Sequence, residues 1–129
     1  MRKIVSSDSE LEQEIGFSRA CRIGNSIAVS GTAPIDNGVT AHKGDVYRQT
    51  KLCLEKSIHA IEVAGGNARQ VIRTRILLTD ISTWKQAAKA HGEIFSTIKP
   101  ACTFVEVSGF IDPEWLVETE MDCVVEVRT

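Results

Sequence analysis

Apolar residues recur every three or four positions in two segments of the chain, Asp45 to Ala64 and about Thr83 to Ile98. This spacing is typical of amphipathic helices, because it places the apolar side chains on one face. Gly65-Gly66 ends the first segment and Pro100 ends the second. The apolar positions are Val46, Cys53, Leu54, Ile58, Ile61 and Ala64 in the first segment, and Trp84, Ala87, His91, Ile94 or Phe95, and Ile98 in the second.

Shorter segments in which apolar and polar residues alternate predict strands around these helices. Gly24-Asn25 supplies turn chemistry between two of the strands. The order β-β-β-α-β-α-β-β predicts a single α+β domain over residues 1–129, in which two helices cover one face of a mixed sheet. The predicted strands are about Lys3–Val5, Phe17–Ile23, Ser26–Ser30, Val71–Leu78, Ala101–Val107 and Trp115–Val127.

The last predicted strand has one apolar and one acidic face. Glu118, Glu120 and Asp122 alternate with apolar residues, which we expect to face the helices. By the same rule we expect Thr103, Val105 and Val107 to face the helices, and the residues between them to share the helix-free face with Glu118. That face would carry Cys102, Phe104, Glu106 and Glu118. Such a mixture suits a subunit interface with a pocket better than a solvated face, although a solvated face with stray apolar residues is the alternative.

Composition and charge narrow the function classes. The formal net charge is −2 and the sequence pI is about 5.9, and basic residues gather only loosely at Arg69, Arg73 and Arg75. Nucleic-acid binding is therefore disfavoured. There is no leader-like or membrane-spanning apolar run, so we expect a cytoplasmic protein. The cysteines Cys21, Cys53, Cys102 and Cys123 form no Cys-x-x-Cys pair, which favours reduced thiols and no metal site.

The C-terminal part of the chain resembles a known family signature. Lys99 through Glu120 is similar to the signature of the Rid (YjgF-like) family, roughly Pro-Ala-Arg-Ser-x-Val-x-Val, a loop, then [Val/Ile]-Glu-[Ile/Val]-Glu. Val29-Ser30-Gly31 resembles the family's Ser-Gly pair, and Glu62 to Gly66 resembles its Glu-Ala-Ala-Gly helix end. Across nearly its whole length the chain is identified as a member of this family.

The resemblance implies a chorismate-mutase-like fold and a homotrimer with a central barrel and three inter-subunit clefts. It also implies cofactor-free hydrolysis of small enamines and imines to keto acids and ammonia. In the family pattern a glutamate positions the attacking water and an arginine holds the substrate carboxylate. The glutamate matches Glu118, but the arginine position is Cys102.

Loss of that arginine removes a planar fork that holds a carboxylate through two charge-assisted hydrogen bonds. We therefore expect ordinary 2-imino acids to be poor substrates. Arg19 is one substitute ligand, beside Phe17, which aligns with a cleft tyrosine of the family; alternatively Arg19 pairs with Glu106 or Glu120 at the interface. Cys102 is either a nucleophile, or a small residue that fills the vacated space.

Most of the remaining cleft residues have two interpretations, one functional and one structural. His91 or Glu118 would be the base for a Cys102 nucleophile, but a lone helical histidine is more often a packing residue. The Ser30 hydroxyl either binds a ligand or caps the strand end, and Cys53 and Cys123 are expected in the core. The candidate site consists of Glu118 and Cys102 as catalytic residues and Phe17, Arg19, Ser30, Gly31, Thr103, Phe104 and His91 as substrate-binding residues.

Three functions follow from these observations. The first is a cofactor-free deaminase or hydrolase that acts on a small imine, enamine or related metabolite. The second is a trimer that binds a small metabolite without chemistry. The third, an endoribonuclease or translation inhibitor, is disfavoured by the acidic pI and the scattered basic residues.

Overall fold

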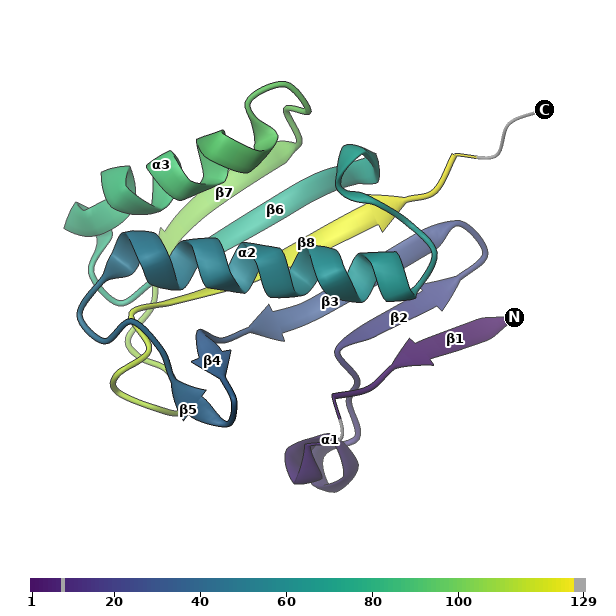
Figure 1. Ribbon diagram of the computed structural model, residues 1–129, viewed down its shortest axis with the longest axis horizontal. Coiled ribbons are helices and arrows are strands. Elements are labelled where there is room, and N and C mark those ends of the chain that lie inside the picture. Colours follow the sequence, from purple (N-terminus) through teal and green to yellow (C-terminus); the bar gives the residue numbers. More distant parts are fainter. Residues whose placement is uncertain (8, 127–129) are drawn as a thin grey trace.

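A six-stranded sheet forms the centre of the computed structural model, which describes residues 1–7 and 9–126. The strand order is β1-β2-β3-β8-β6-β7, and α2 and α3 lie side by side on one face (Figure 1). The strands of this sheet are β1 (Arg2–Val5), β2 (Ala20–Ile23), β3 (Ser26–Thr32), β6 (Val71–Leu78), β7 (Ala101–Glu106) and β8 (Val117–Val124). The other elements are a hairpin of β4 (Ile35–Asp36) and β5 (Val39–Thr40), the helices α1 (Glu10–Ile15), α2 (Val46–Val63) and α3 (Trp84–Phe95), and the 3-10 turns η1 (Ala68–Gln70) and η2 (Ile81–Thr83).

The predicted α+β architecture is confirmed. Strand β7 is parallel to β6, whereas the other neighbouring strands of the sheet are antiparallel, so the sheet is mixed. The α2 prediction is accurate to one residue at each end, because the Asp45 carboxylate caps the first turn and Ala64 ends the helix. Within the described residues, no helix is both long and apolar enough to cross a membrane.

Several boundaries differ from the prediction. The strand expected from Phe17 begins only at Ala20, because Gly16, at φ 88°, ends the unpredicted helix α1 and redirects the chain. Strand β8 begins at Val117, so Trp115 lies in the preceding loop. It ends at Val124, before the predicted end at Val127, which lies outside the described residues. Helix α3 ends at Phe95 rather than at Ile98.

The core lies between the sheet and the helices α2 and α3. Its fully buried side chains include Leu54, Ile61, Ile76, Leu78, Phe95, Val117 and Met121. Gln49, also fully buried, donates to the carbonyl oxygens of Ala41 and Glu114 and accepts from Leu116 N–H at 2.9 Å. This one amide fixes the loop before β8, which carries Trp115.

The two faces of β8 are as predicted, but the prediction for β7 is wrong. Phe104 packs against α3, with its ring centroid 6.2 Å from that of Trp84, and so points to the helix-covered face. Cys102 and Glu106 share that face by alternation, whereas Glu118 lies on the opposite one. The pattern failed because both alternating sets of this edge strand contain apolar residues, and it is Phe104 that packs against the core while Val105 is exposed.

Candidate functional site

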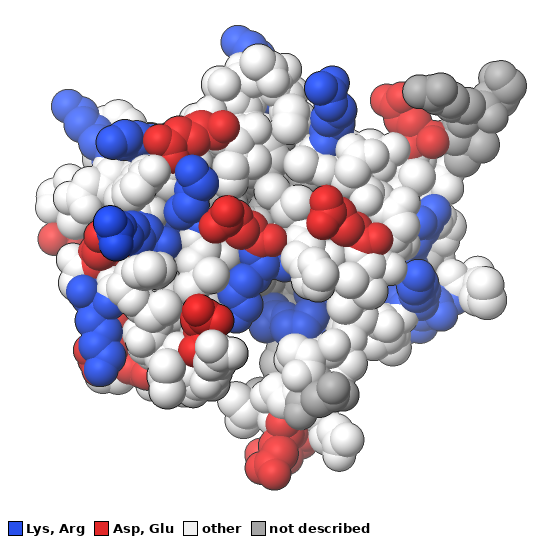
Figure 2. Space-filling view, in the orientation of Figure 1, with Lys and Arg blue, Asp and Glu red and all other residues white. Residues whose placement is uncertain are grey.

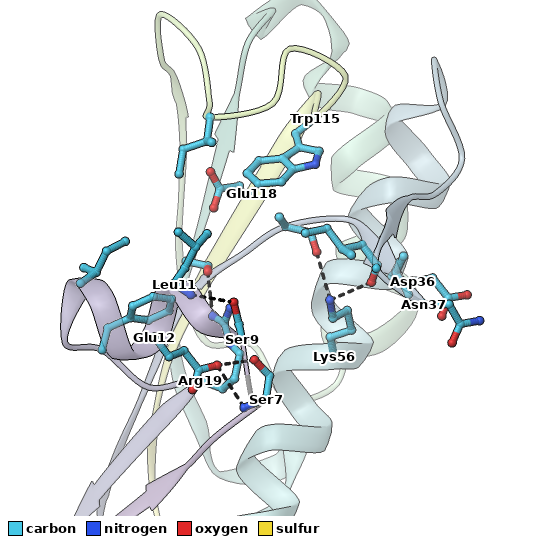
Figure 3. A pocket seen from close by; sticks show the side chains of 18 residues that line it. Ser7, Ser9, Leu11, Glu12, Arg19, Asp36, Asn37, Lys56, Trp115 and Glu118 are labelled. Carbon is cyan, nitrogen blue, oxygen red and sulfur yellow. Dashed lines mark hydrogen bonds between the residues drawn. The ribbon is translucent and has the colours of Figure 1, made fainter.

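A cavity of about 720 Å³ lies at the end of the sheet, where α1, α2, β3 and the loop before β8 meet. Four of the predicted site residues line it: Phe17, Arg19, Gly31 and Glu118. Figure 3 shows Glu118 beside Trp115 toward one end, with Arg19, Glu12 and Ser7 toward the other. A single chain therefore brings together a cation, an aromatic ring and a carboxylate that are far apart in sequence.

Arg19 is half-buried and held by main-chain oxygen. Its Nη2 donates to the Gly31 carbonyl oxygen at 2.8 Å and to Thr32 Oγ1 at 3.5 Å, and the guanidinium lies 5.8 Å from the Phe17 ring centroid. Burial lowers the pKa of Arg19, an effect that nearby Glu12 and Glu118 oppose. No carboxylate of the described residues lies within ion-pair distance of the guanidinium, and a guanidinium has five N–H donors. Arg19 therefore retains donors for an anionic ligand.

Glu118 projects from β8 on the helix-free face and is half-buried. Burial raises the pKa of this carboxyl, and the charge of Glu120 raises it further. The charge of Arg19 acts in the opposite direction and lowers it. Its Oε1 lies directly over Gly31, since a Cβ at that position would be 3.3 Å from the oxygen. Gly31 thus leaves room for the Glu118 carboxylate on one side and binds Arg19 through its carbonyl on the other. A carboxyl with a raised pKa in a cavity is suited to exchange protons with a bound molecule.

Sequence patterns alone did not single out Lys56 and Glu12, which complete the charged lining. Lys56 Nζ donates to the Ile35 carbonyl oxygen at 2.8 Å, and burial lowers its pKa. Burial acts to raise the pKa of Glu12, but hydrogen bonds from Ser7 and Ser6 outweigh it and lower the pKa. Ser9 and Glu12 match a capping-box sequence pattern, a signal that could have indicated α1 but was not used. No sequence signal predicts the site of Lys56, because the carbonyls it contacts belong to the distant hairpin.

The other predicted site residues lie outside this cavity. Cys102 and Thr103 are exposed on the edge strand β7. His91 Nε2 is 2.8 Å from Thr74 Oγ1, its ring packs against Phe95, and burial lowers its pKa. Phe104 and His91 therefore help to hold α3 on the sheet within one chain.

Ser30 is also turned away from the cavity lining. Its hydroxyl donates to the Ser18 carbonyl oxygen, which joins β3 to the segment before β2. Of the two interpretations of Ser30, the strand-end contact is the one present in the single chain. Among residues 1–7 and 9–126, no three His, Cys, Asp or Glu side chains are grouped to hold a metal ion.

Comparison with known proteins identifies the chain's relatives. Residues 7–125 match the family described as Endoribonuclease L-PSP. An uncharacterized protein of Streptomyces coelicolor, SCO2049, is 35% identical over 118 residues, covering 92% of this chain and 88% of that protein. The 3-aminoacrylate deaminase RutC of Acinetobacter baylyi is 33% identical over 100 residues, covering 77% of this chain and 79% of that protein.

Solved structures share the fold. The crystal structure of Rv2704 from Mycobacterium tuberculosis, described as a member of the YjgF/YER057c/UK114 family, superposes with a TM-score of 0.88. It is 39% identical in sequence, and the match covers 97% of this chain and all of that one, 100%. The protein TdcF of E. coli, solved with bound serine, is 17% identical and has a TM-score of 0.79, with 95% of this chain and 94% of that chain covered, which shows a common fold alone.

Proposed function

The chain belongs to the Endoribonuclease L-PSP family, also called the Rid or YjgF family, and on that premise we propose that it is a cofactor-free hydrolase. Its substrate is a small enamine or imine, which it deaminates in the cavity that contains Glu118. The Arg19–Gly31–Glu118 arrangement supports this most directly, because it puts a cation and a carboxyl of raised pKa around one glycine. The relative named 3-aminoacrylate deaminase supports the reaction class.

The proposed reaction adds water to a C=N bond and releases ammonia. An enamine first gains a proton at carbon from solvent and becomes the iminium ion, which an imine substrate forms by protonation at nitrogen. The Glu118 carboxylate then accepts a proton from water as the water oxygen bonds to the iminium carbon, and donates it to the nitrogen. The C–N bond breaks as the hydroxyl proton passes to Glu118 and on to solvent, so that ammonia leaves and a carbonyl remains. A raised pKa suits Glu118 to both steps, because the same carboxyl must accept and donate a proton near neutral pH.

Arg19 is the proposed ligand of the substrate carboxylate, in place of the arginine that the family pattern has at position 102. Its guanidinium can form two parallel hydrogen bonds to a carboxylate while Nη2 keeps its bond to Gly31. The carboxylate is then held from a different position. We therefore expect 2-imino acids, whose reacting carbon is bonded directly to the carboxylate, to be poorer substrates than 3-aminoacrylate, whose reacting carbon is one bond further away.

A homotrimer is the proposed assembly, as the family resemblance implies. Exposed apolar side chains line the cavity, namely Leu11, Ile15 and Ile111. An exposed apolar rim of this kind is typical of a surface that a second subunit covers. A neighbouring copy of the chain can place its exposed edge strand β7, which carries Cys102, over this apolar rim. In this arrangement Cys102 occupies the space where family members carry their arginine.

The experiment is a comparison of ammonia release by the wild type and Cys102→Arg. The substrates are 2-iminobutyrate and 2-iminopropionate, each generated in situ by an amino-acid oxidase, and 3-aminoacrylate. We expect the wild type to favour 3-aminoacrylate and Cys102→Arg to gain activity on the 2-imino acids. Inactivity of both proteins on all three substrates would contradict the proposal.

If a thermal shift accompanied that inactivity, it would indicate the alternative of a metabolite-binding protein without chemistry. The endoribonuclease alternative has weaker support. In Figure 2 basic and acidic side chains are interspersed over the visible face, without the continuous basic stripe that phosphate binding favours.

A further inference from the structure

A second cavity, of about 510 Å³, lies on the helix-covered side of the sheet. Helix α2 covers β3 and β8 but leaves β1 and β2 without a helix above them (Figure 1). The resulting groove between α2 and the edge of the sheet has an apolar floor, formed by Val5, Val29, Ala60 and Val63. We call it the α2 groove.

Two cations lie at one end of the α2 groove, whose lining also includes the exposed carboxylate of Glu55. Arg19 and Lys56 line both this groove and the cavity that contains Glu118, so the two cations form a shared wall. In Figure 2 basic side chains lie recessed in a hollow between α2 and α1. Thr32 adds a hydroxyl, which Arg19 Nη2 already contacts at 3.5 Å.

The two cations lack a carboxylate partner in the part of the chain that the structure describes. Their hydrogen bonds go to carbonyl and hydroxyl oxygens, and no described carboxylate lies within ion-pair distance of either. Burial lowers the pKa of each, and Arg19 lowers that of Lys56 further. Neighbouring half-buried cations are costly unless an anion compensates them.

We propose that the α2 groove binds a small amphipathic carboxylate, with its carboxylate on Arg19 and Lys56 and its hydrocarbon tail along Val5, Val29, Ala60 and Val63. The volume falls within the range of about 300–1,000 Å³ that is usual for small-molecule sites, and an apolar floor with a few polar groups at one end is the usual composition of such a site. Glu118 has no part in this site, but Arg19 belongs to both, so a carboxylate bound in the groove would compete with the substrate carboxylate for Arg19.

The chain carries separate natural reporters for the two cavities. His59 lines the α2 groove and not the first cavity, whereas Trp115 lines the first cavity and not the groove. His42, His91 and Trp84 line neither and serve as internal references. NMR spectra of the histidine rings and tryptophan indoles, recorded at fixed pH during titration with hexanoate, therefore distinguish the two sites.

We expect hexanoate to shift the His59 resonances in a saturable way and to leave those of Trp115 unchanged. Hexanol, which has the same chain length and no charge, should bind about tenfold more weakly or worse, because it lacks a charge-assisted bond. An unshifted His59, a shift confined to Trp115, or equal binding of hexanol would each overturn the proposal.

Four substitutions locate the ligand. Val63→Trp fills the outer end of the groove from an exposed position, and should weaken hexanoate binding about tenfold by calorimetry. Glu62→Trp, at an adjacent exposed position outside the groove, should not change it. Lys56→Met should weaken hexanoate binding by a similar factor, and Glu118→Gln should leave it unchanged. Equal affinities of Val63→Trp and Glu62→Trp would place hexanoate elsewhere and contradict the proposal.

Discussion

Two carboxylates approach Arg19 from different regions of the molecule, and their surroundings move their pKa values in opposite directions. Glu12, on the short helix α1, is buried but accepts hydrogen bonds from Ser6 and Ser7, and its pKa is lowered. Glu118, on the central strand β8, is half-buried with the like charge of Glu120 nearby, and its pKa is raised. Burial lowers the pKa of Arg19, and the charges of both carboxylates act to raise it.

The difference assigns separate roles to the two groups. A carboxylate with several hydrogen-bond donors stays ionised and serves structure, whereas a carboxyl of raised pKa in a cavity can gain and lose protons. Glu12 therefore holds α1 to the segment directly before it, and Glu118 is the group suited to chemistry. The following predictions test this division, from the largest expected effect to the smallest.

Replacement of Glu118 by Gln should lower turnover by about 100- to 10,000-fold, because the amide keeps the shape of the side chain but cannot shuttle a proton. Ligand affinity should change only a few-fold. The measurement is single-turnover ammonia release together with equilibrium binding of the product. Glu120→Gln is the matched control, since Glu120 projects from the same face of β8 but pairs with Arg75 at 3.6 Å outside the cavity. Equal turnover by the two variants would remove Glu118 from the reaction.

Loss of the Arg19 charge should lower kcat/KM about 100-fold in Arg19→Met, mainly through KM. Two charge-assisted hydrogen bonds to the substrate carboxylate are lost, each worth about 1.5–3 kcal/mol in isolation. Arg19→Lys should recover part of the affinity but not the two-point geometry. Steady-state kinetics with Arg69→Met, at an exposed position outside both cavities, as a control measure this. An unchanged KM in Arg19→Met would show that the carboxylate is held by another group.

The Glu12→Gln substitution should destabilise the fold by about 1–3 kcal/mol at neutral pH, because an ionised acceptor of several hydrogen bonds becomes a neutral amide. A lowered pKa contributes stability above the unfolded-state pKa, and this stability is lost as the pH falls through the folded-state value. The difference from wild type should therefore shrink in acid. Chemical denaturation at several pH values measures it.

The same experiment on Glu118→Gln should give the opposite sign. A raised pKa means that ionisation costs stability as the pH rises through the folded-state value, so the amide should stabilise the fold at neutral pH and not in acid. If both substitutions destabilised the protein equally at neutral pH, the contrast between the two carboxylates would be wrong.

The smallest expected effect belongs to Gly31→Ala. The new methyl would contact Glu118 Oε1 at 3.3 Å, so the carboxylate must shift by a few tenths of an ångström. We expect kcat to fall a few-fold with little loss of thermal stability, because a flexible side chain can adjust. A Tm scan and a kcat measurement test this, and an unaffected kcat would show that the exact position of Glu118 is unimportant.

The sequence predicts the long elements and fails on the short ones. Helices α2 and α3 and the long strands along the chain follow from periodicity sustained over several turns or alternations, and the two faces of β8 follow because one set is acidic. Helix α1 and the β4-β5 hairpin are too short to show a period. The face assignment of β7 fails because Phe104 and Val105 are both apolar, and only the packing of α3 decides between them.

The candidate site was predicted in part for the same reason. The resemblance and strand positions brought forward Phe17, Arg19, Gly31 and Glu118, which share a cavity. Lys56 and Trp115 were missed, since their places depend on the hairpin carbonyls and on the contacts of Gln49. Such contacts join residues far apart in the chain and leave no local pattern.

The most direct test of the Arg19–Glu118 site is a crystal structure of the protein with bound 3-oxopropanoate, the product of 3-aminoacrylate hydrolysis. We predict that its carboxylate contacts the Arg19 guanidinium through two hydrogen bonds and that its aldehyde oxygen faces Glu118. A 3-oxopropanoate molecule seated away from both residues, for instance against β7 alone, would contradict the account.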